Sequence, residues 1–358
     1  MINYLCVWDN KNDKTKSWSG TNYSLMSALM KQESVKDVGI VYNKIEKIAI
    51  KVAYKINITF GELLINFIRK QKTKNIDNSP TIEIGDLNEK IKRYYIYQDM
   101  SIPSLIYIKN NNPLAFKYTG FDKYTSKQLE KRLEIQMKMY NNSSGIFTMS
   151  KWLANNLKEN TNISKEKIHF VGAGINVPKE LIDIYQKKEK NKILFVGRDF
   201  ERKGGKIVLE AFNVLKNKYN SKAILYIAGP KKNPNEKCYN GVEFLGDISY
   251  NELSKYFNLC DIFCMPSYYE AYGIVFAEAL IYGLPCIARN DFEMKEFIKD
   301  GYNGYLINDD DIEQLALKMD KLLNNDEIIE NVKKEKQNYI EQYSWDNVAK
   351  RMLKCINK

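Results

Sequence analysis

The sequence is poor in the residues from which many active sites and metal sites are built. A single histidine, His169, stands among its 358 residues, which argues against a Ser-His-Asp triad and against a multi-histidine metal site. The six cysteines form no CxxC pair, so we expect reduced, buried thiols rather than a zinc site. They are Cys6, Cys238, Cys260, Cys264, Cys286 and Cys355.

Long apolar runs are missing as well. No segment reaches about eighteen uninterrupted apolar residues, the length that indicates a membrane-spanning helix. The N-terminal stretch "MINYLCVWDN" has no basic residue before its short apolar run and meets Asp9 directly after it. We therefore expect a strand there, and neither a signal peptide nor a membrane span.

Acidic residues are scarce in one half of the chain only. Residues 1–175 hold 27 Lys and Arg against 16 Asp and Glu, whereas residues 176–358 hold 28 of each, so the whole net charge of +11 belongs to the N-terminal half. This asymmetry favours an anionic partner for that half, such as a membrane surface, an acidic acceptor or a nucleic acid. A lysine-rich proteome would give the same counts without any partner, and the composition leaves both explanations open.

Alternating strand and helix patterns fill the C-terminal half. Four apolar runs, each bounded by glycine, proline or polar residues, predict strands at 192–198, 223–230, 242–247 and 261–267. The stretches between them have helical spacing, and Ser249 with Glu252 forms a capping-box pattern. Such alternation predicts a doubly wound parallel sheet.

The N-terminal half repeats this alternation less clearly, and its strand "KIHFVG" gives His169 a structural role. A chain of this length favours two domains. We predict a first domain at 1–176 and a second at 177–341, with the break near Pro178. The amphipathic last helix, at about 342–358, is expected to fold back onto the first domain.

Two glutamates flank a predicted helix start in "EAYGIVFAE" (270–278). We expect Glu270 in the loop before the helix and Glu278 in its second turn, with Gly273 allowing a ligand close to the backbone. A helix N-terminus offers unpaired N–H donors to anions, and the carboxylates suit sugar hydroxyls. The donors belong to Tyr272, Gly273, Ile274 and Val275. The pattern suits a sugar-nucleotide site, but spacing alone equally fits a buried helix with two acids at its edges.

A pair of cations follows the first strand of the C-terminal half, in "VGRDFERKGG". Arg198 and Lys203 lie in the turn before a helix, where they suit a diphosphate and would neutralise it as a leaving group. Arg202 and Glu201 fit a solvated, charged turn. No G-x-G-x-x-G occurs in this stretch, which argues against a dehydrogenase.

A third motif, "WSGTNYSL" (18–25), marks the entry to a helix in the first domain. Gly20 would let the loop approach a phosphate or sugar, and Thr21 is expected to cap the helix. An ordinary helix entry explains the same residues equally well.

Together these motifs resemble a known family. "VGRDFERKGG", "YIAGP", "VEFLGD", "DIFCMPSYYEAYGIVFAEALIYGLPCIA" and "GYNGYLI" are similar to the C-terminal domain of retaining family 4 glycosyltransferases of the GT-B fold, the glycosyl transferases group 1. "WSGTNYSL" and "FTMSKWLANNL...KIHFVGAGIN" resemble parts of the N-terminal domain. The likeness spans about the whole chain, tightly at 192–308 and loosely at 26–140. It implies an α/β architecture of two Rossmann-like domains that face a cleft, with the last helix crossing back.

The resemblance also implies roles for single residues. Glu270 would bind hydroxyls of the donor sugar, and Glu278 would hold the ribose hydroxyls. Arg198 and Lys203 would stabilise the leaving nucleoside diphosphate with no metal and no other cofactor, and Gly20 would lie near the diphosphate. Backbone donors to the diphosphate and sugar would come from Tyr272, Gly273, Ile274 and Val275.

The chain departs from the family at the end of one N-terminal strand, where many members carry a histidine near the reacting carbon. Here "YYIYQDMS" places Asp99 or Gln98 at that point. Asp99 would accept a hydrogen bond from a sugar hydroxyl, or it caps the turn after the strand. With Glu270 assigned to sugar hydroxyls, no nucleophile remains for a double displacement. We therefore expect a front-face reaction, in which the leaving phosphate oxygen takes the proton of the acceptor.

The expected activity is hexosyl transfer from a UDP- or GDP-sugar to a glycan, lipid-linked or polysaccharide acceptor. The acceptor side would be the basic N-terminal domain, where "ELLINFIRKQKTK" (62–74) and "LIYIKNNNPLAFKYTGF" (105–121) mix basic with apolar or aromatic residues. Such segments suit a surface that rests on anionic lipid, but they also fit a core helix followed by a charged loop. We expect a cytoplasmic protein with peripheral contact to the inner face of the membrane.

Two other functions remain open on the sequence. A nucleotide-sugar epimerase of the same architecture would act without an acceptor and would need acid and base groups at the donor sugar. A nucleotide- or nucleic-acid-binding module without transferase activity would use the basic half instead, although no known nucleic-acid motif occurs and we expect no nucleic-acid partner.

Overall fold

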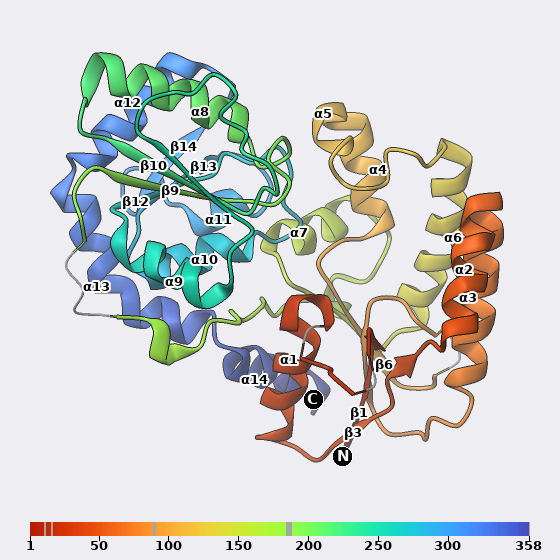
Figure 1. Ribbon diagram of the computed structural model, residues 1–358. Coiled ribbons are helices and arrows are strands. Elements are labelled where there is room, and N and C mark those ends of the chain that lie inside the picture. The colour runs from red at the N-terminus through yellow and green to blue at the C-terminus, as the bar shows by residue number, and fades with distance from the viewer. Residues whose placement is uncertain (11, 16, 89–90, 184–187, 358) are drawn as a thin grey trace. The chain divides into compact units, whose positions relative to one another are not determined.

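The computed structural model describes residues 1–10, 12–15, 17–88, 91–183 and 188–357 (Figure 1). The chain divides into two compact units, which are treated one at a time below. The first unit comprises Met1–Pro113, Gly120–Asn176 and Ser344–Lys358. The second unit comprises Leu114–Thr119 and Val177–Tyr343.

A six-stranded parallel sheet forms the centre of the first unit, in the order β3-β1-β5-β6-β7-β8. Its strands are β1 (Ile2–Leu5), β3 (Val35–Asp37), β5 (Thr81–Ile84), β6 (Tyr94–Gln98), β7 (Gly145–Thr148) and β8 (Ile168–Phe170). A separate two-stranded sheet pairs β2 (Val7–Trp8) with β4 (Ile40–Val41). Every residue of β1, β6 and β7 is buried, as expected for parallel strands covered on both faces.

The helices of the first unit connect these strands. The longer ones are α1 (Thr21–Met30), α2 (Lys44–Ile56), α3 (Ile58–Lys72), α4 (Ile102–Asn111), α6 (Ser126–Asn142), α7 (Lys151–Asn160) and α14 (Trp345–Ile356). The helix α14 packs against α1. Arg351 Nε donates to the carbonyl of Val171 at 2.6 Å, so the chain's last helix is tied to this unit. A short helix, α5 (Pro113–Phe116), begins where the two units divide the chain.

The second unit has its own six-stranded parallel sheet, in the order β11-β10-β9-β12-β13-β14. The strands are β9 (Lys192–Val196), β10 (Ile224–Ala228), β11 (Val242–Gly246), β12 (Ile262–Cys264), β13 (Cys286–Arg289) and β14 (Gly304–Ile307). The helices are α8 (Gly205–Val214), α9 (Tyr250–Leu259), α10 (Ile274–Ile281), α11 (Met294–Phe297), α12 (Ile312–Leu323) and α13 (Asp326–Gln342). The order of the strands is that of a dinucleotide-type Rossmann sheet, which reverses between β9 and β12.

Several local predictions are confirmed and two are wrong. Ser249 and Glu252 make the predicted capping box of α9, and α10 begins after Gly273 as expected. Thr21 does not cap α1: the N-cap is Gly20, at φ +88°, and no side chain caps that helix. Cys238 is exposed and Cys355 partly so, whereas the other four cysteines are buried as predicted.

Candidate functional site

The strand-order reversal of the second unit brings two loops together. In a doubly wound sheet, ligands bind beyond the carboxyl ends of the strands at such a reversal. The loop after β9 carries Lys203 and the loop after β12 carries Glu270, so the sheet topology puts two predicted site residues in one place. The approach is close, because a Cβ on Gly204 would lie 2.5 Å from the carbonyl oxygen of Pro266. Only glycine fits there, and its φ of +75° requires glycine as well.

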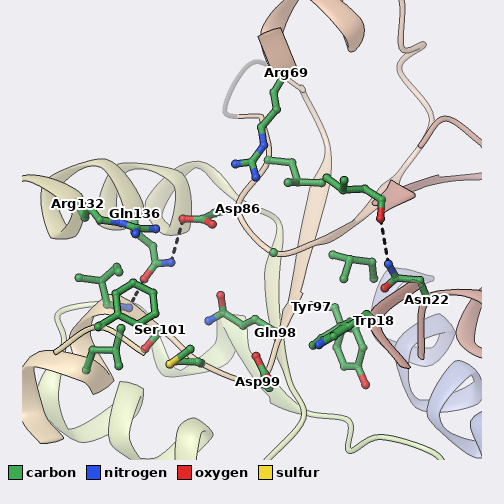
Figure 2. A pocket seen from close by; sticks show the side chains of 18 of the residues that line it. Trp18, Asn22, Arg69, Asp86, Tyr97, Gln98, Asp99, Ser101, Arg132 and Gln136 are labelled. Carbon is green, nitrogen blue, oxygen red and sulfur yellow. Dashed lines mark hydrogen bonds between the residues drawn. The ribbon is translucent and has the colours of Figure 1, made fainter. Parts of the chain in front are cut away.

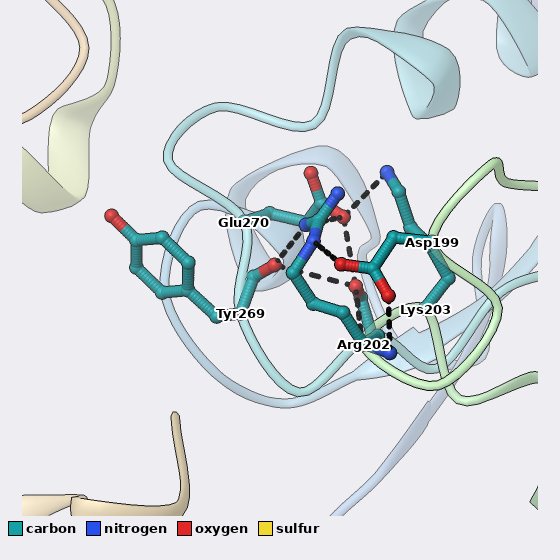
Figure 3. A network of polar contacts seen from close by, with 6 residues as sticks. Asp199, Arg202, Lys203, Tyr269 and Glu270 are labelled. Atoms are coloured by element: carbon teal, nitrogen blue, oxygen red, sulfur yellow. Dashed lines mark hydrogen bonds and ion pairs between the residues drawn. The ribbon is translucent and has the colours of Figure 1, made fainter. Parts of the chain in front are cut away.

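Glu270 is the centre of a buried ionic network in this place (Figure 3). Three donors reach the same carboxylate oxygen, Oε1: Lys203 Nζ at 2.6 Å, Ser267 Oγ at 2.8 Å and Arg202 Nη1 at 3.0 Å. The other oxygen, Oε2, accepts no hydrogen bond from any residue in the described ranges. The network therefore fixes the carboxylate in position and leaves one of its oxygens available as an acceptor.

The charges of this network support one another. Burial raises the pKa of Glu270, but Lys203 and Arg202 outweigh that effect and hold the pKa below its usual value. Burial lowers the pKa of Lys203, and the charge of Glu270 opposes that change. At neutral pH we take both groups to be charged, because Arg202 and Ser267 also donate to the carboxylate.

Arg202 is the functional residue that sequence reasoning missed. We expected it in a solvated turn, yet its side chain is 22% exposed and its guanidinium binds both Glu270 and the carbonyl of Tyr269. The sequence did indicate such a role, since Arg202 directly precedes Lys203 in a turn that we predicted to bind a diphosphate. Sequence spacing could not show which of several adjacent cations would point inward.

Arg198 lies differently from its predicted partner Lys203. Its side chain is 80% exposed and pairs with Asp247 at 3.1 Å. No contact of the described residues joins Arg198 to the Glu270 network. The structure therefore does not bring the two predicted cations together, although both follow β9.

Glu278 lies in the second turn of α10, as predicted, and is buried at 8% exposure. Burial raises the pKa of its carboxyl to about 8, with Lys203 opposing that change. Such a carboxyl is mostly protonated at neutral pH. Among the residues with described positions, no side chain is hydrogen-bonded to it, so its hydrogen-bonding capacity is unused.

The N-terminus of α10 lies between the two glutamates. Gly273 is its N-cap at φ +90°, where a side chain would be strained and would also meet Phe276 Cδ2 at 3.2 Å. The first turn of a helix lacks intrahelical acceptors for its N–H groups. Ile274 and Val275 begin that turn, and Tyr272 precedes it. Four predicted backbone donors are thus at a helix start, where an anion can be bound.

The first unit has a separate cavity of about 530 Å³ at its own strand-order reversal, between β1 and β5 (Figure 2). Asp99 lines it at the end of β6, and burial raises the pKa of that carboxyl to about 6. Gln98 lines it too, but its amide donates to Tyr140 Oη at 2.6 Å. Gln136 crosses one wall, where its amide donates to Asp86 at 3.0 Å.

The loop of the "WSGTNYSL" motif borders this cavity through Trp18. Trp18, Ser19 and Gly20 all have positive φ, and Asn176 Nδ2 holds the strained loop by donating to the carbonyl of Ser19 at 2.8 Å. Gly20 and Thr21 are thus at a helix start in the first unit.

An apolar surface covers two helices of the first unit. Residues spaced by three or four positions lie on one face of a helix. The members of this surface, which we call the α2–α3 stripe, are Ile45, Ile48, Val52, Ile56, Phe60, Leu63 and Phe67, all between 49% and 79% exposed. Exposed lysines flank the stripe on α2, namely Lys44, Lys47, Lys51 and Lys55. Within the described ranges, no helix is both long and apolar enough to cross a membrane.

Comparison with known proteins finds a family match for the part of the chain that forms most of the second unit. Residues 178–353 match the family described as glycosyl transferases group 1. An uncharacterised glycosyltransferase of Methanocaldococcus jannaschii is 28% identical over 230 residues, which cover 58% of each chain. The sulfoquinovosyl transferase SQD2 of Arabidopsis thaliana is 32% identical over 163 residues, 44% of this chain and 31% of the relative. The chain thus aligns with about a third to three fifths of the lengths of these two relatives.

A solved structure matches along the whole chain. The Anabaena protein HepE, crystallised in complex with UDP and glucose, superposes with a TM-score of 0.63 at 11% identity and covers 100% of this chain and 99% of its own. This likeness concerns the fold alone. It confirms the predicted GT-B class of two Rossmann-like domains.

Proposed function

Because residues 178–353 match the family described as glycosyl transferases group 1, we propose that the chain transfers a sugar from a nucleoside-diphosphate sugar to a carbohydrate or lipid-linked acceptor. The observation that carries this proposal is the state of Glu270. Three donors hold one of its oxygens, and the other is left as an acceptor for sugar hydroxyls. A carboxylate fixed in this way can orient a sugar without reacting with it.

The donor diphosphate is proposed to bind at the start of α10. The helix N-terminus and Gly273 offer backbone donors, and Lys203 supplies a positive charge close by. Glu278 lies one turn further along α10, and its unused carboxyl suits the paired hydroxyls of a ribose. Glu270, the start of α10 and Glu278 thus follow one another along the chain, in the order proposed for the sugar, the diphosphate and the ribose.

The proposed reaction retains the configuration of the sugar and proceeds on one face. Negative charge develops on the leaving diphosphate as its bond to the sugar breaks, and fixed cations lower the barrier most when they are already in position. Lys203 is held in position by Glu270, whereas the exposed Arg198 would have to leave Asp247 to take part. The leaving phosphate oxygen takes the proton of the acceptor hydroxyl. We propose that no metal ion or other cofactor is needed, because the cations of the protein supply the positive charge.

Asp99 is proposed to act on the acceptor side. Its carboxyl lines the cavity of the first unit and is close to half ionised near pH 6, so it can accept a hydrogen bond from a sugar hydroxyl at neutral pH. This role differs from that of a nucleophile, which would have to contact the reacting carbon.

The α2–α3 stripe and its lysines support peripheral contact with anionic lipid. Apolar side chains enter the boundary of the bilayer while lysines beside them bind anionic headgroups. On this basis we propose a protein that works at the cytoplasmic surface of a membrane, where a lipid-linked acceptor would be within reach.

A panel of nucleotide sugars tests the function directly. A bound donor stabilises the folded protein, by about 2.7 kcal/mol at one hundred times its dissociation constant, so the cognate donor should raise the melting temperature. Each donor that binds is then incubated with and without candidate acceptors. Transfer that requires an acceptor supports the proposal, whereas conversion of the donor sugar without one would indicate an epimerase. If no nucleotide sugar protects the protein, the proposal is wrong.

A further inference from the structure

A second cavity in the first unit adjoins the one that contains Asp99. It has a volume of about 510 Å³ and lies between α3 and α6. Four residues line both cavities: Arg69, Asp86, Leu87 and Arg132. The two cavities therefore meet at a junction that carries two guanidinium groups.

The two cavities differ in the residues around them. The first contains the carboxyl of Asp99, which suits a sugar hydroxyl, beside the amides of Gln98 and Gln136, which already donate to Tyr140 and Asp86. The second is lined by charged and polar residues and also by apolar side chains, including Leu63, Phe67, Ile135 and Met139. Leu63 and Phe67 belong to the α2–α3 stripe and are 58% and 61% exposed, so the apolar side of this cavity is continuous with the exposed apolar surface.

The described residues around the second cavity have an excess of positive charge. Four cationic side chains and two carboxylates line it. The cations are Arg69, Lys70, Arg132 and Lys138, and the carboxylates are Glu62 and Asp86. Arg132 already pairs with Glu62 at 2.9 Å.

Arg69 differs from Arg132 in its partners. Its Nε donates to the hydroxyl of Tyr42 at 3.0 Å, and it has no ion pair with any residue whose position is described. A guanidinium without a direct ion pair at the edge of two cavities is a favourable place for a phosphate, which it can bind through two parallel hydrogen bonds.

We propose that the two cavities together bind an acceptor sugar that is joined through a phosphate to a lipid. The sugar occupies the cavity beside Asp99, the phosphate is bound at Arg69 with Arg132 nearby, and the hydrocarbon chain lies over Leu63, Phe67 and Ile135. From there the chain continues to the α2–α3 stripe, which rests on the membrane. This inference names the acceptor class and therefore rests on the proposed glycosyltransferase function.

The test measures binding of farnesyl phosphate, farnesol and inorganic phosphate by calorimetry, below the concentration at which the lipids form micelles. Farnesyl phosphate should bind at least about ten times more tightly than either of the other two, because it alone contacts both the apolar cavity and Arg69. Equal affinity for farnesol and farnesyl phosphate would overturn the proposal.

Variants locate the binding. Arg69→Gln should weaken the binding of farnesyl phosphate about tenfold and that of farnesol less than about twofold, since a hydrogen bond between charged groups is lost only with the phosphate. Lys165→Gln, which removes one exposed charge from the first unit outside both cavities and outside the α2–α3 stripe, is the matched control and should change neither affinity. Arg69→Lys keeps the charge and should restore part of the affinity. Equal losses in Arg69→Gln and Lys165→Gln would show that only general charge attraction is at work, and would overturn the proposal.

The donor site provides the remaining control. UDP should protect the wild-type protein against thermal unfolding whether or not farnesyl phosphate binds, because the proposed UDP site belongs to the second unit and the proposed lipid site to the first. If UDP protects and farnesyl phosphate fails to bind, the acceptor class is wrong while the transferase function stands. If no nucleotide or nucleotide sugar protects, the function itself fails.

Discussion

The two units share one architecture but differ in what they expose. Each has a six-stranded parallel sheet covered by helices, yet of the 17 large hydrophobic residues found exposed in the described chain, 14 lie in the first unit and three in the second. The charge surplus follows the same division, because the whole +11 belongs to residues 1–175. A surface that is both apolar and basic is suited to lipid, and a neutral, well-covered unit is suited to a water-soluble nucleotide.

The polar sites of the two units also differ, in how far their charged groups are paired with one another. In the second unit the charged groups already satisfy one another, with Lys203, Arg202 and Ser267 all directed at one oxygen of Glu270. In the first unit Arg69 and Asp99 lie at cavities and have no direct ion pair with any residue whose position is described. A preorganised network favours a fixed chemical step, whereas uncompensated groups favour a ligand that brings its own charge.

The largest effect should come from the network of the second unit. Lys203→Ala should reduce kcat by about 100- to 1,000-fold, because a fixed cation beside the leaving group is lost, and should weaken donor binding far less. Steady-state kinetics and a donor titration separate the two quantities. Lys206→Ala, which removes an exposed lysine paired with Glu201, is the control and should leave kcat unchanged. Unchanged turnover with only poorer binding would refute the assignment of Lys203.

The proposed contact of the first unit with anionic lipid predicts a charge effect of similar size. Replacement of Lys47, Lys51 and Lys55 by Gln should weaken binding to vesicles that contain anionic lipid about a hundredfold at low salt, since each lysine contributes about 1 kcal/mol. Sedimentation measures the bound fraction. The same change at the exposed Lys222, Lys231 and Lys232 of the second unit is the control. Equal losses in both variants would mean that the two units do not differ in this respect.

A buried carboxyl in each unit makes stability depend on pH. Burial raises the pKa of both Glu278 and Glu83 to about 8. A carboxyl whose folded pKa is raised stabilises the protein fully below its unfolded value near 4.5, and this contribution is lost as the pH rises through about 8.

Each carboxyl therefore lowers the free energy of unfolding by up to about 1.4 kcal/mol per pH unit between its two pKa values. Glu278→Gln and Glu83→Gln should each flatten this dependence when denaturant unfolding is measured from pH 5 to 8. Saturating UDP should change the slope of the Glu83→Gln variant and not that of Glu278→Gln, because only Glu278 is expected to contact the nucleotide. Identical slopes in wild type and both variants would contradict the raised pKa values.

The smallest effects are expected at two glycines that flank α10, one before its first residue and one just after its end. Gly273→Ala and Gly283→Ala should each lower the free energy of unfolding by about 1–2 kcal/mol, because both positions have positive φ. A Cβ at Gly283 would meet nothing within 4 Å, so that variant reports backbone strain alone. Only Gly273→Ala should weaken UDP binding, as measured by titration. If both variants bind UDP equally well, the start of α10 is not the diphosphate site.

The sequence allowed more to be predicted for the second unit than for the first. The apolar runs of β9 to β12, the capping box at Ser249 and the start of α10 at Gly273 are local features, so they could be predicted from the sequence alone. Glu270, Lys203 and Glu278 were identified by motif, and the sheet order brings the first two into contact. Arg202 was not predicted to point inward, and Arg198 pairs with Asp247 instead of joining the Glu270 network, because side-chain direction within a turn depends on what the neighbouring strand's loop offers.

The sequence by itself determined the class of the fold, the charge asymmetry and the residue types of the proposed nucleotide site. These depend on composition, on periodicity and on short motifs. Only the tertiary structure decided that Oε1 of Glu270 accepts all three hydrogen bonds of its network while Oε2 accepts none from the described residues. It also decided that Arg69 lies where two cavities meet. Finally, it decided that seven apolar residues of α2 and α3 remain exposed. The physical reason is that each of these properties depends on atoms from segments far apart in the chain, and burial and hydrogen bonding are settled only when those segments pack.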